Sequence, residues 1–208
     1  MYYGKKVNFI TFEGPDGSGK STVSKKVFEK LVSYFKNEKE FILTREPGGT
    51  DIAEDIRKII LSKDIDKRTE TLLFAASRNE HVKKKIIPAI ENGKIVLCDR
   101  FIHSSLVYQG YFRDIGINEV LQVNKFGIGD FLPDLIFYLD VPVETSIKRL
   151  KELRENLDRM DFVSDKEIAK INDGYKIVLD LPNVYKINAN REIDQIVDEI
   201  FSIIVSKV

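Results

Sequence analysis

Short runs of apolar, often β-branched residues alternate along the chain with longer segments that carry helical spacing. The short runs predict β-strands at residues 7–13, 41–45, 95–99, 135–141 and 184–187. Several of these runs are apolar almost without interruption, which is typical of parallel strands covered on both faces. Strands that alternate with helices predict a parallel sheet with right-handed crossover connections, and therefore an α/β fold.

The segments between the strands show apolar residues at intervals of three or four positions. Two clear apolar stripes lie at residues 23–35 and 193–204. Further helices without strands of their own are predicted at residues 50–61, 69–90 and, in pieces, 104–126. Helical insertions at the carboxyl edge of a doubly wound sheet are where ligand clefts form. The spacing of the charged segment 148–160 alone predicts a solvated helix.

Length and composition narrow the class of protein. The chain has 208 residues and no repeat or linker that divides it, so we expect one domain at residues 1–208. Lys and Arg number 33, as do Asp and Glu, and this balance does not favour a nucleic-acid partner. No apolar stretch is long enough for a membrane span, and no signal-peptide pattern is present. Together with a single cysteine, Cys98, these features predict a cytoplasmic protein.

Residues 14–21 read GPDGSGKS and match the phosphate-binding pattern G-x-x-x-x-G-K-[ST] in full. The glycines allow main-chain N–H groups to turn toward phosphate oxygens, and the positive end of the following helix adds to the anion site. We expect the Lys20 ammonium to contact the β and γ phosphates of ATP and the Ser21 hydroxyl to ligate Mg²⁺. The predicted ATP-binding residues are Gly14, Pro15, Asp16, Gly17, Ser18, Gly19, Lys20, Ser21 and Thr22.

A P-loop alone is shared by GTPases, hydrolytic ATPases, small-molecule kinases and binding modules without turnover. The Asn-Lys-x-Asp signature of guanine recognition is missing, because no aspartate follows the pair Asn124-Lys125 at the required position. The apolar strands that end at Asp99 and Asp140 are not followed by a glutamate that would activate water. These observations weaken the hydrolase interpretations. A kinase and a non-catalytic nucleotide-binding module remain as alternatives.

Arginines near the carboxyl ends of strands indicate a second anion beside ATP. Arg45 and Arg100 each follow a predicted strand, and Arg78 lies in the predicted helix at 69–90. A guanidinium group can donate two parallel hydrogen bonds to a phosphate. Arg78 taken alone would be interpreted as a surface ion pair. Three such arginines together suit a phosphoryl acceptor that carries its own phosphate.

Six blocks of the sequence resemble bacterial thymidylate kinase, in that family's order and spacing and over nearly the whole chain. They are FEGPDGSGKST at 12–22, TREPGGT at 44–50, LLFAASR at 72–78, CDRFIHSSLVYQG at 98–110, PDLIFYLDV at 133–141 and LDRM at 157–160. The resemblance implies a P-loop fold of the nucleoside-monophosphate-kinase type, with a five-stranded parallel sheet ordered 2-3-1-4-5. It also implies transfer of the γ-phosphoryl group of ATP to dTMP, with Mg²⁺, by a homodimer. A kinase of another nucleoside monophosphate is the alternative, which the EPGGT and SSLVYQG stretches disfavour.

The resemblance assigns roles to individual residues. Arg45 and Arg100 would hold the 5′-phosphate of dTMP, Asp16 would contact the 3′-hydroxyl of the sugar, and Tyr108 would lie close to the sugar. Phe74 would stack on the thymine ring, as flat bases prefer aromatic faces. The residues expected at the polar edge of the base are Arg78, Ser105 and Gln109.

The same resemblance implies that the segment 148–160 is a lid. Some relatives carry a catalytic arginine in the P-loop, where this chain has Gly17, and others supply it from the lid. Arg154 is the predicted lid arginine, because its distance to LDRM matches the lid pattern; Arg149 and Arg159 are weaker candidates. Asp99 is expected near Mg²⁺, with direct ligation left open. The predicted catalytic residues are Lys20, Arg45, Asp99, Arg100 and Arg154.

Transfer is expected in line and without a covalent intermediate, since the acceptor phosphate oxygen is already a nucleophile. His81 and His103 therefore need no catalytic part and are interpreted as surface residues or residues behind the site. Cys98 is predicted to be a buried small apolar residue of a strand.

Overall fold

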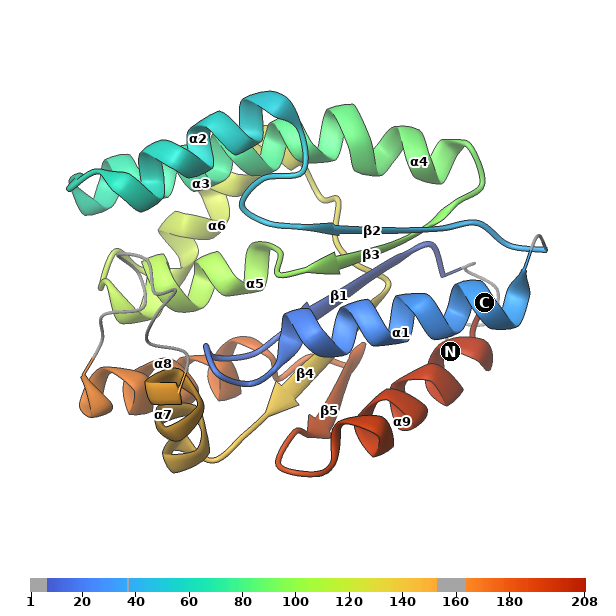
Figure 1. Ribbon diagram of the computed structural model, residues 1–208. Coiled ribbons are helices and arrows are strands. Elements are labelled where there is room, and N and C mark those ends of the chain that lie inside the picture. The colour runs from blue at the N-terminus through green and yellow to red at the C-terminus, as the bar shows by residue number, and fades with distance from the viewer. Residues whose placement is uncertain (1–6, 37, 153–163) are drawn as a thin grey trace.

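The computed structural model describes residues 7–36, 38–152 and 164–208 (Figure 1). The strands in these residues are β1 (Phe9–Glu13), β2 (Phe41–Arg45), β3 (Ile95–Asp99), β4 (Leu135–Asp140) and β5 (Val184–Asn188). They form one parallel sheet in the order β2-β3-β1-β4-β5. This confirms the predicted order and the predicted strands, whose ends differ from the observed ones by two residues at most.

Helices connect the strands. Those in the described residues are α1 (Lys20–Phe35), α2 (Asp51–Ser62), α3 (Lys67–His81), η1 (Val82–Ile86), α4 (Ile87–Glu91), α5 (Ile102–Ser105), η2 (Leu106–Phe112), α6 (Ile117–Ile128), α7 (Val143–Glu152), α8 (Asp165–Val178) and α9 (Ile193–Val205). The π-helical segment η1 continues α3 into α4, so the helix predicted at 69–90 is one continuous helical stretch. Asp66 caps α3 by accepting the N–H groups of Arg68 and Thr69.

Helices cover both faces of the sheet and give three layers (Figure 1). Successive residues of a strand point to opposite faces, so each face contributes its own apolar side chains. Ile10 and Phe12 of β1 pack with the apolar stripes of α1 and α9 on one face. Phe9 packs on the other face with residues of η1, η2, α6 and α8, and Cys98 is buried in the same cluster. Burial of Cys98 confirms its predicted place in the core.

The carboxyl ends of β1, β2 and β3 lie next to one another at one edge of the sheet. Each of these strands leads into a loop that carries predicted site residues: 14–19 after β1, 46–50 after β2 and 100–101 after β3. The fold thus brings together the blocks that lie far apart in the sequence. None of the helices in the described residues is both long and apolar enough to cross a membrane.

Candidate active site

The P-loop joins β1 to α1, and α1 begins at Lys20. Gly14 and Gly17 have φ angles of 148° and 77°, and a Cβ on either would lie 2.7–2.8 Å from a main-chain carbonyl oxygen. Neither position therefore accepts another residue without a shift of the backbone. A cavity of about 580 Å³ opens over the loop, with residues 16–23 along its wall. The loop has the geometry of the predicted anion site.

Lys20 is buried within this loop. Its ammonium donates a 2.7 Å hydrogen bond to the carbonyl oxygen of Pro15 and lies 4.0 Å from the Asp16 carboxylate. Burial, together with repulsion from Arg100, lowers the pKa of Lys20 to about 8. Negative charge placed beside the ammonium would raise this pKa again, because it favours the charged form. The electrostatics of the loop therefore favour an anion.

Ser21 and Asp99 meet where the P-loop approaches the end of β3. The Ser21 hydroxyl donates a 2.5 Å hydrogen bond to Oδ2 of Asp99. The other carboxylate oxygen, Oδ1, is buried and finds no hydrogen-bond partner in the described chain. Outside the segments left undescribed, no three His, Cys, Asp or Glu side chains gather to hold a metal on their own. Mg²⁺ usually takes one or two protein oxygens and completes its shell with water and phosphate oxygens, so this pair fits that ion.

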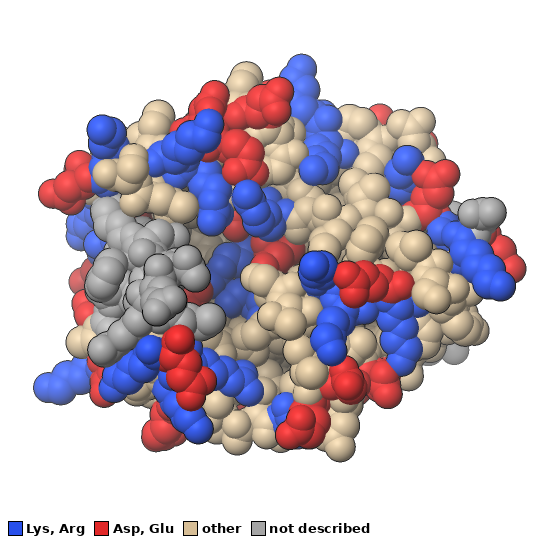
Figure 2. Space-filling view, in the orientation of Figure 1, with Lys and Arg blue, Asp and Glu red and all other residues tan. Residues whose placement is uncertain are grey.

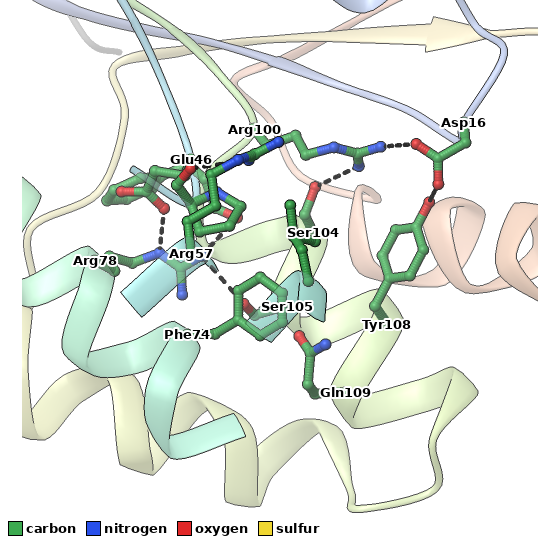
Figure 3. A pocket seen from close by; sticks show the side chains of 13 residues that line it. Asp16, Glu46, Arg57, Phe74, Arg78, Arg100, Ser104, Ser105, Tyr108 and Gln109 are labelled. Atoms are coloured by element: carbon green, nitrogen blue, oxygen red, sulfur yellow. Dashed lines mark hydrogen bonds and ion pairs between the residues drawn. The ribbon is translucent and has the colours of Figure 1, made fainter. Parts of the chain in front are cut away.

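A second cavity of about 170 Å³ lies between the carboxyl edge of the sheet and the helices α2, α3 and η2 (Figure 3). Its lining consists of Asp16, Glu46, Pro47, Arg57, Leu61, Phe74, Arg78, Arg100, Phe101, Ser104, Ser105, Tyr108 and Gln109. Asp16 and Arg100 also line the cavity over the P-loop, so the two cavities meet at this pair. Figure 2 shows Lys and Arg side chains bordering the recess near the middle of this face, although the chain has no net charge.

Arg100 lies where the two cavities meet. Its φ of 69° lies in the left-handed region, which a residue with a side chain adopts only at a cost. One nitrogen of its guanidinium group donates to Ser104 Oγ and Tyr175 Oη at 3.1 and 3.0 Å, and the other binds the Asp16 carboxylate. Asp16 also accepts a 2.6 Å hydrogen bond from the Tyr108 hydroxyl. Burial alone would raise the pKa of Asp16, but the charges of Arg100 and Lys20, with the hydrogen bond from Tyr108, outweigh it and lower this pKa.

Arg78 is 3 % exposed, so its interpretation as a surface ion pair is wrong. Its Nε donates to Glu46 at 2.7 Å, and its terminal nitrogens donate to Asn124 Oδ1 at 2.5 Å and to Ser105 Oγ at 3.1 Å. The second oxygen of Glu46 lies 3.0 Å from Nδ1 of His81. This network fixes the plane of the guanidinium group at the wall of the cavity.

Both histidines are buried, which corrects the interpretation of either one as a surface residue. His81 bridges the loop after β2, because its Nε2 lies 2.8 Å from Oγ1 of Thr44 while Nδ1 contacts Glu46. A Cβ on Gly49 would lie 2.5 Å from the His81 ring, so the loop packs closely on α3. Burial and the nearby Arg78 charge lower the pKa of His103 to about 4, so this side chain is neutral near pH 7.

Arg45 lies beside the second cavity but not in its lining, so its predicted contact with the acceptor phosphate stays a prediction. Its guanidinium group is half exposed, donates to the carbonyl oxygen of Pro47 and lies 3.0 Å from Glu54. Arg57 of α2 lines that cavity instead and donates to the same carbonyl oxygen at 3.0 Å. Arg57 lies within a helix and not at the end of a strand, so its position in the sequence did not mark it as a phosphate ligand. The remaining predicted acceptor residues all line the cavity: Asp16, Phe74, Arg78, Arg100, Ser105, Tyr108 and Gln109.

Comparison with known proteins decides the family. The family model described as thymidylate kinase matches residues 12–200. The chain is 45% identical over 206 residues to a thymidylate kinase of Malacoplasma penetrans, which covers 96% of both chains. It is 48% identical to a thymidylate kinase of Clostridium novyi, over 92% of this chain and 95% of that protein. The chain belongs to the thymidylate kinase family.

A solved structure supports the same family at the level of the fold. The crystal structure of the thymidylate kinase from Ehrlichia chaffeensis superposes with a TM-score of 0.77 at 32% sequence identity. The match covers 96% of this chain and all of that one. The predicted fold class, a three-layer P-loop fold with the sheet order 2-3-1-4-5, is therefore confirmed for this chain.

The segment 148–160, predicted to be a lid, lies mostly outside the described residues. Arg154 and Arg159 fall in the segment 153–163, so their predicted roles stay predictions. Arg149 is described and belongs to α7, beside the P-loop. Its guanidinium group donates to the carbonyl oxygens of Gly17 at 3.3 Å and Ala189 at 3.2 Å, and it lines the cavity over the loop.

Glu13 lies behind the two cavities and lines neither of them, and the sequence pattern predicted no role for it. It ends β1 and is fully buried, and it accepts hydrogen bonds from Phe101 N at 2.8 Å and Ser104 Oγ at 2.6 Å. Burial raises the pKa of Glu13 to about 7, although its hydrogen bonds and the Arg100 charge oppose the rise. The available signal was an acidic residue at the end of an otherwise apolar strand.

Proposed function

We propose that the two cavities hold the two substrates of one transfer, with ATP on the P-loop and dTMP in the smaller cavity. As a member of the thymidylate kinase family the chain is a dTMP kinase, which uses ATP to phosphorylate dTMP to dTDP. The observation that carries the placement is that Asp16 and Arg100 line both cavities. The γ-phosphoryl group and the acceptor phosphate would meet at this pair.

The acceptor phosphate would lie against Arg57 and Arg100. Both side chains line the smaller cavity, and guanidinium groups bind phosphate through charge-assisted hydrogen bonds. Asp16 would accept a hydrogen bond from the sugar hydroxyl, because its low pKa keeps it ionised, with Tyr108 beside it. These contacts would place the nucleophilic oxygen in line with the γ phosphorus, and such placement supplies much of the rate in phosphoryl transfer.

The base would lie between Phe74 and the polar side chains of α3, α5 and η2. Ser105 Oγ accepts a hydrogen bond from Arg78, so its own hydrogen can be donated into the cavity. A donor at this position suits the C4 carbonyl oxygen of thymine, and the Gln109 carbonyl group would accept the N3–H. The ring of Phe74 lines the same cavity and would stack on the base.

On the ATP side, the P-loop N–H groups and Lys20 would hold the β and γ phosphates. Ser21 and Asp99 would hold Mg²⁺, which would offset the negative charge of the ATP phosphates. Arg100, and Arg154 from the lid, would neutralise charge that develops on the transferred group. Because the acceptor oxygen is already anionic, no general base is needed and no covalent enzyme intermediate forms.

An ADP-release assay with dTMP, dUMP, CMP, UMP, AMP and GMP as acceptors tests this function. We expect the highest kcat/KM for dTMP and no release with ATP alone beyond a slow background. A higher kcat/KM for another monophosphate would contradict the acceptor assignment. ADP release that no acceptor stimulates would favour a hydrolase, and no release at all would favour a binding module.

We also propose that residues 1–208 act as one domain in a cytoplasmic homodimer. The apolar side chains of Leu72 on α3 and Phe126 on α6 are 57% and 96% exposed, and these two helices pack against each other. Such exposure on adjacent helices favours a partner surface. Sedimentation equilibrium should give a dimer for the wild type and a monomer for Phe126→Glu. The matched change Ile177→Glu on α8 should leave the dimer intact, and a monomeric wild type would contradict the proposal.

A further inference from the structure

The orientation of the Gln109 side-chain amide is set from behind the acceptor cavity. Gln109 belongs to η2, and its Nε2 donates a 3.1 Å hydrogen bond to Oε1 of Glu70. Glu70 lies in the first turn of α3, is 1 % exposed and does not line the cavity. A carboxylate accepts hydrogen bonds but donates none, so the amide NH₂ group must face Glu70. The carbonyl oxygen of Gln109 then faces away from Glu70.

The close view of the cavity agrees with this orientation. In Figure 3 the carbonyl oxygen of Gln109 lies on the side of Phe74, and the amide nitrogen lies on the opposite side. Both residues line the cavity. The oxygen therefore presents an acceptor to a base that rests on the Phe74 ring.

The second oxygen of Glu70 is engaged by a cation. Oε2 of Glu70 accepts a hydrogen bond from a terminal nitrogen of Arg113 at 3.3 Å. Arg113 itself is tied to α3, because Lys67 of that helix donates to the Arg113 carbonyl oxygen at 3.2 Å. The two oxygens of Glu70 thus have different partners, Gln109 for Oε1 and Arg113 for Oε2.

The orientation matters because pyrimidines differ at this edge. Thymine and uracil present a carbonyl oxygen at C4 and an N–H at N3, whereas cytosine presents an amino group at C4 and a bare nitrogen at N3. A cavity with an acceptor on Gln109 and a donor on Ser105 matches thymine and leaves cytosine with two unpaired contacts. A site built to pair such polar groups rejects a mismatched analogue strongly, because buried groups are then left unpaired. A flipped Gln109 amide would remove half of this discrimination.

We propose that Glu70 is a positioning residue that determines base specificity, by holding the Gln109 amide with its carbonyl oxygen toward the base. The inference rests on the proposed binding of dTMP in this cavity. It adds to that proposal a residue that touches no substrate and acts through Gln109 alone.

The test is the ratio of kcat/KM for dTMP to kcat/KM for dCMP in Glu70→Gln. A glutamine at position 70 keeps the size of the side chain, but its NH₂ group can donate to the Gln109 carbonyl oxygen and permit the flipped amide. We expect the ratio to fall at least tenfold. The ratio of dTMP to dUMP should stay within about threefold of wild type, because uracil presents the same edge as thymine.

Two further variants separate specificity from damage to the fold. Glu80→Gln makes the same chemical change on the same helix, away from the cavity lining, and should leave both ratios unchanged. The double variant Glu70→Gln/Gln109→Glu exchanges the two groups, so that one carboxylate oxygen accepts from position 70 and the other faces the base. This exchange should restore at least tenfold of the lost dTMP preference.

The possible outcomes distinguish the inference from the function on which it rests. An equal loss of kcat/KM for dTMP and dCMP in Glu70→Gln, with no rescue by the double variant, would overturn the role of Glu70. If Glu70→Gln does not fold, the double variant alone decides. A dTMP-to-dCMP ratio of kcat/KM equal to that of the wild type supports the inference, and a ratio at least tenfold lower contradicts it. A wild-type protein that does not prefer dTMP to dCMP would instead contradict the proposed function.

Discussion

Arg45 and Arg57 donate to the same acceptor, the carbonyl oxygen of Pro47, at 2.9 and 3.0 Å, but their guanidinium groups have different surroundings. Arg45 is 47% exposed in its side chain and forms an ion pair with Glu54. Arg57 lines the acceptor cavity. The chain therefore offers two arginines with one shared contact, of which one is placed to bind a phosphate there.

This pair gives the first prediction. Arg57→Ala should raise the KM for dTMP by about 10- to 100-fold, since a hydrogen bond to a charged group contributes about 1.5–3 kcal/mol. Arg45→Ala should change the same KM less than threefold. Initial rates at saturating ATP measure both values. A larger effect of Arg45→Ala would show that the loop after β2 rearranges when dTMP binds.

The two arginines also show where sequence reasoning stops. The strands, the parallel sheet and the P-loop followed from local patterns, because alternating elements and a glycine-rich turn are encoded in neighbouring residues. The order of the strands followed from the family resemblance alone. Arg45 ends a strand at the edge where ligands bind, and this position together with the family resemblance predicts a phosphate contact for it. A side chain at the end of a strand can point toward the ligand cavity or away from it. Only the packing of α2 against the loop after β2 shows that Arg57 reaches the cavity.

Buried polar networks were the other part that the sequence did not reveal. His81 and Glu46 are 35 residues apart in the sequence, and only the docking of the loop after β2 on α3 makes them neighbours. The same holds for Glu70 and Gln109, which come from α3 and η2. Pairings of this kind depend on how helices dock, and no periodicity of the chain records that.

The lowered pKa of Lys20 predicts that the protein takes up protons when ATP binds. This pKa of about 8 means that roughly half of the free protein carries the ammonium charge at pH 8. Bound phosphates favour the charged form, so ATP binding at pH 8 should take up about half a proton. Titration calorimetry in two buffers of different ionisation enthalpy measures this uptake. Lys20→Arg should bind ATP without uptake, because arginine stays protonated; equal uptake in that variant would assign the proton to another group.

Glu13 supports a prediction about stability. Its pKa is raised from 4.5 to about 7 in the folded protein, so between these values the folded state binds more protons than the unfolded state. The contribution of Glu13 to the free energy of unfolding is therefore fully present below pH 4.5. It is lost as the pH rises through about 7, which lowers the free energy of unfolding by about 3 kcal/mol. Urea unfolding at several pH values measures it. In Glu13→Gln the free energy of unfolding should fall less steeply between pH 5 and pH 7, and an unchanged slope would contradict the assignment.

Two arginines of the lid region should act on different kinetic constants. Arg149 donates to the main-chain carbonyl oxygens of Gly17 and Ala189 at the P-loop, so it shapes the ATP cavity before any transfer begins. Arg149→Ala should therefore raise the KM for ATP. Arg154 is predicted to reach the transferred group, and an interaction made in the transition state lowers kcat when it is lost.

Arg154→Ala should accordingly lower kcat by about 10³-fold, the scale of arginines that stabilise phosphoryl transfer, and change both KM values little. Steady-state kinetics with ATP and dTMP varied independently separates the two effects, and Arg154→Lys serves as the conservative control. A lysine keeps the charge but not the two parallel donors, so it should recover only part of the rate. If Arg154→Ala altered KM alone while Arg149→Ala reduced kcat, the transition-state role would pass to Arg149, whose position over the P-loop allows it.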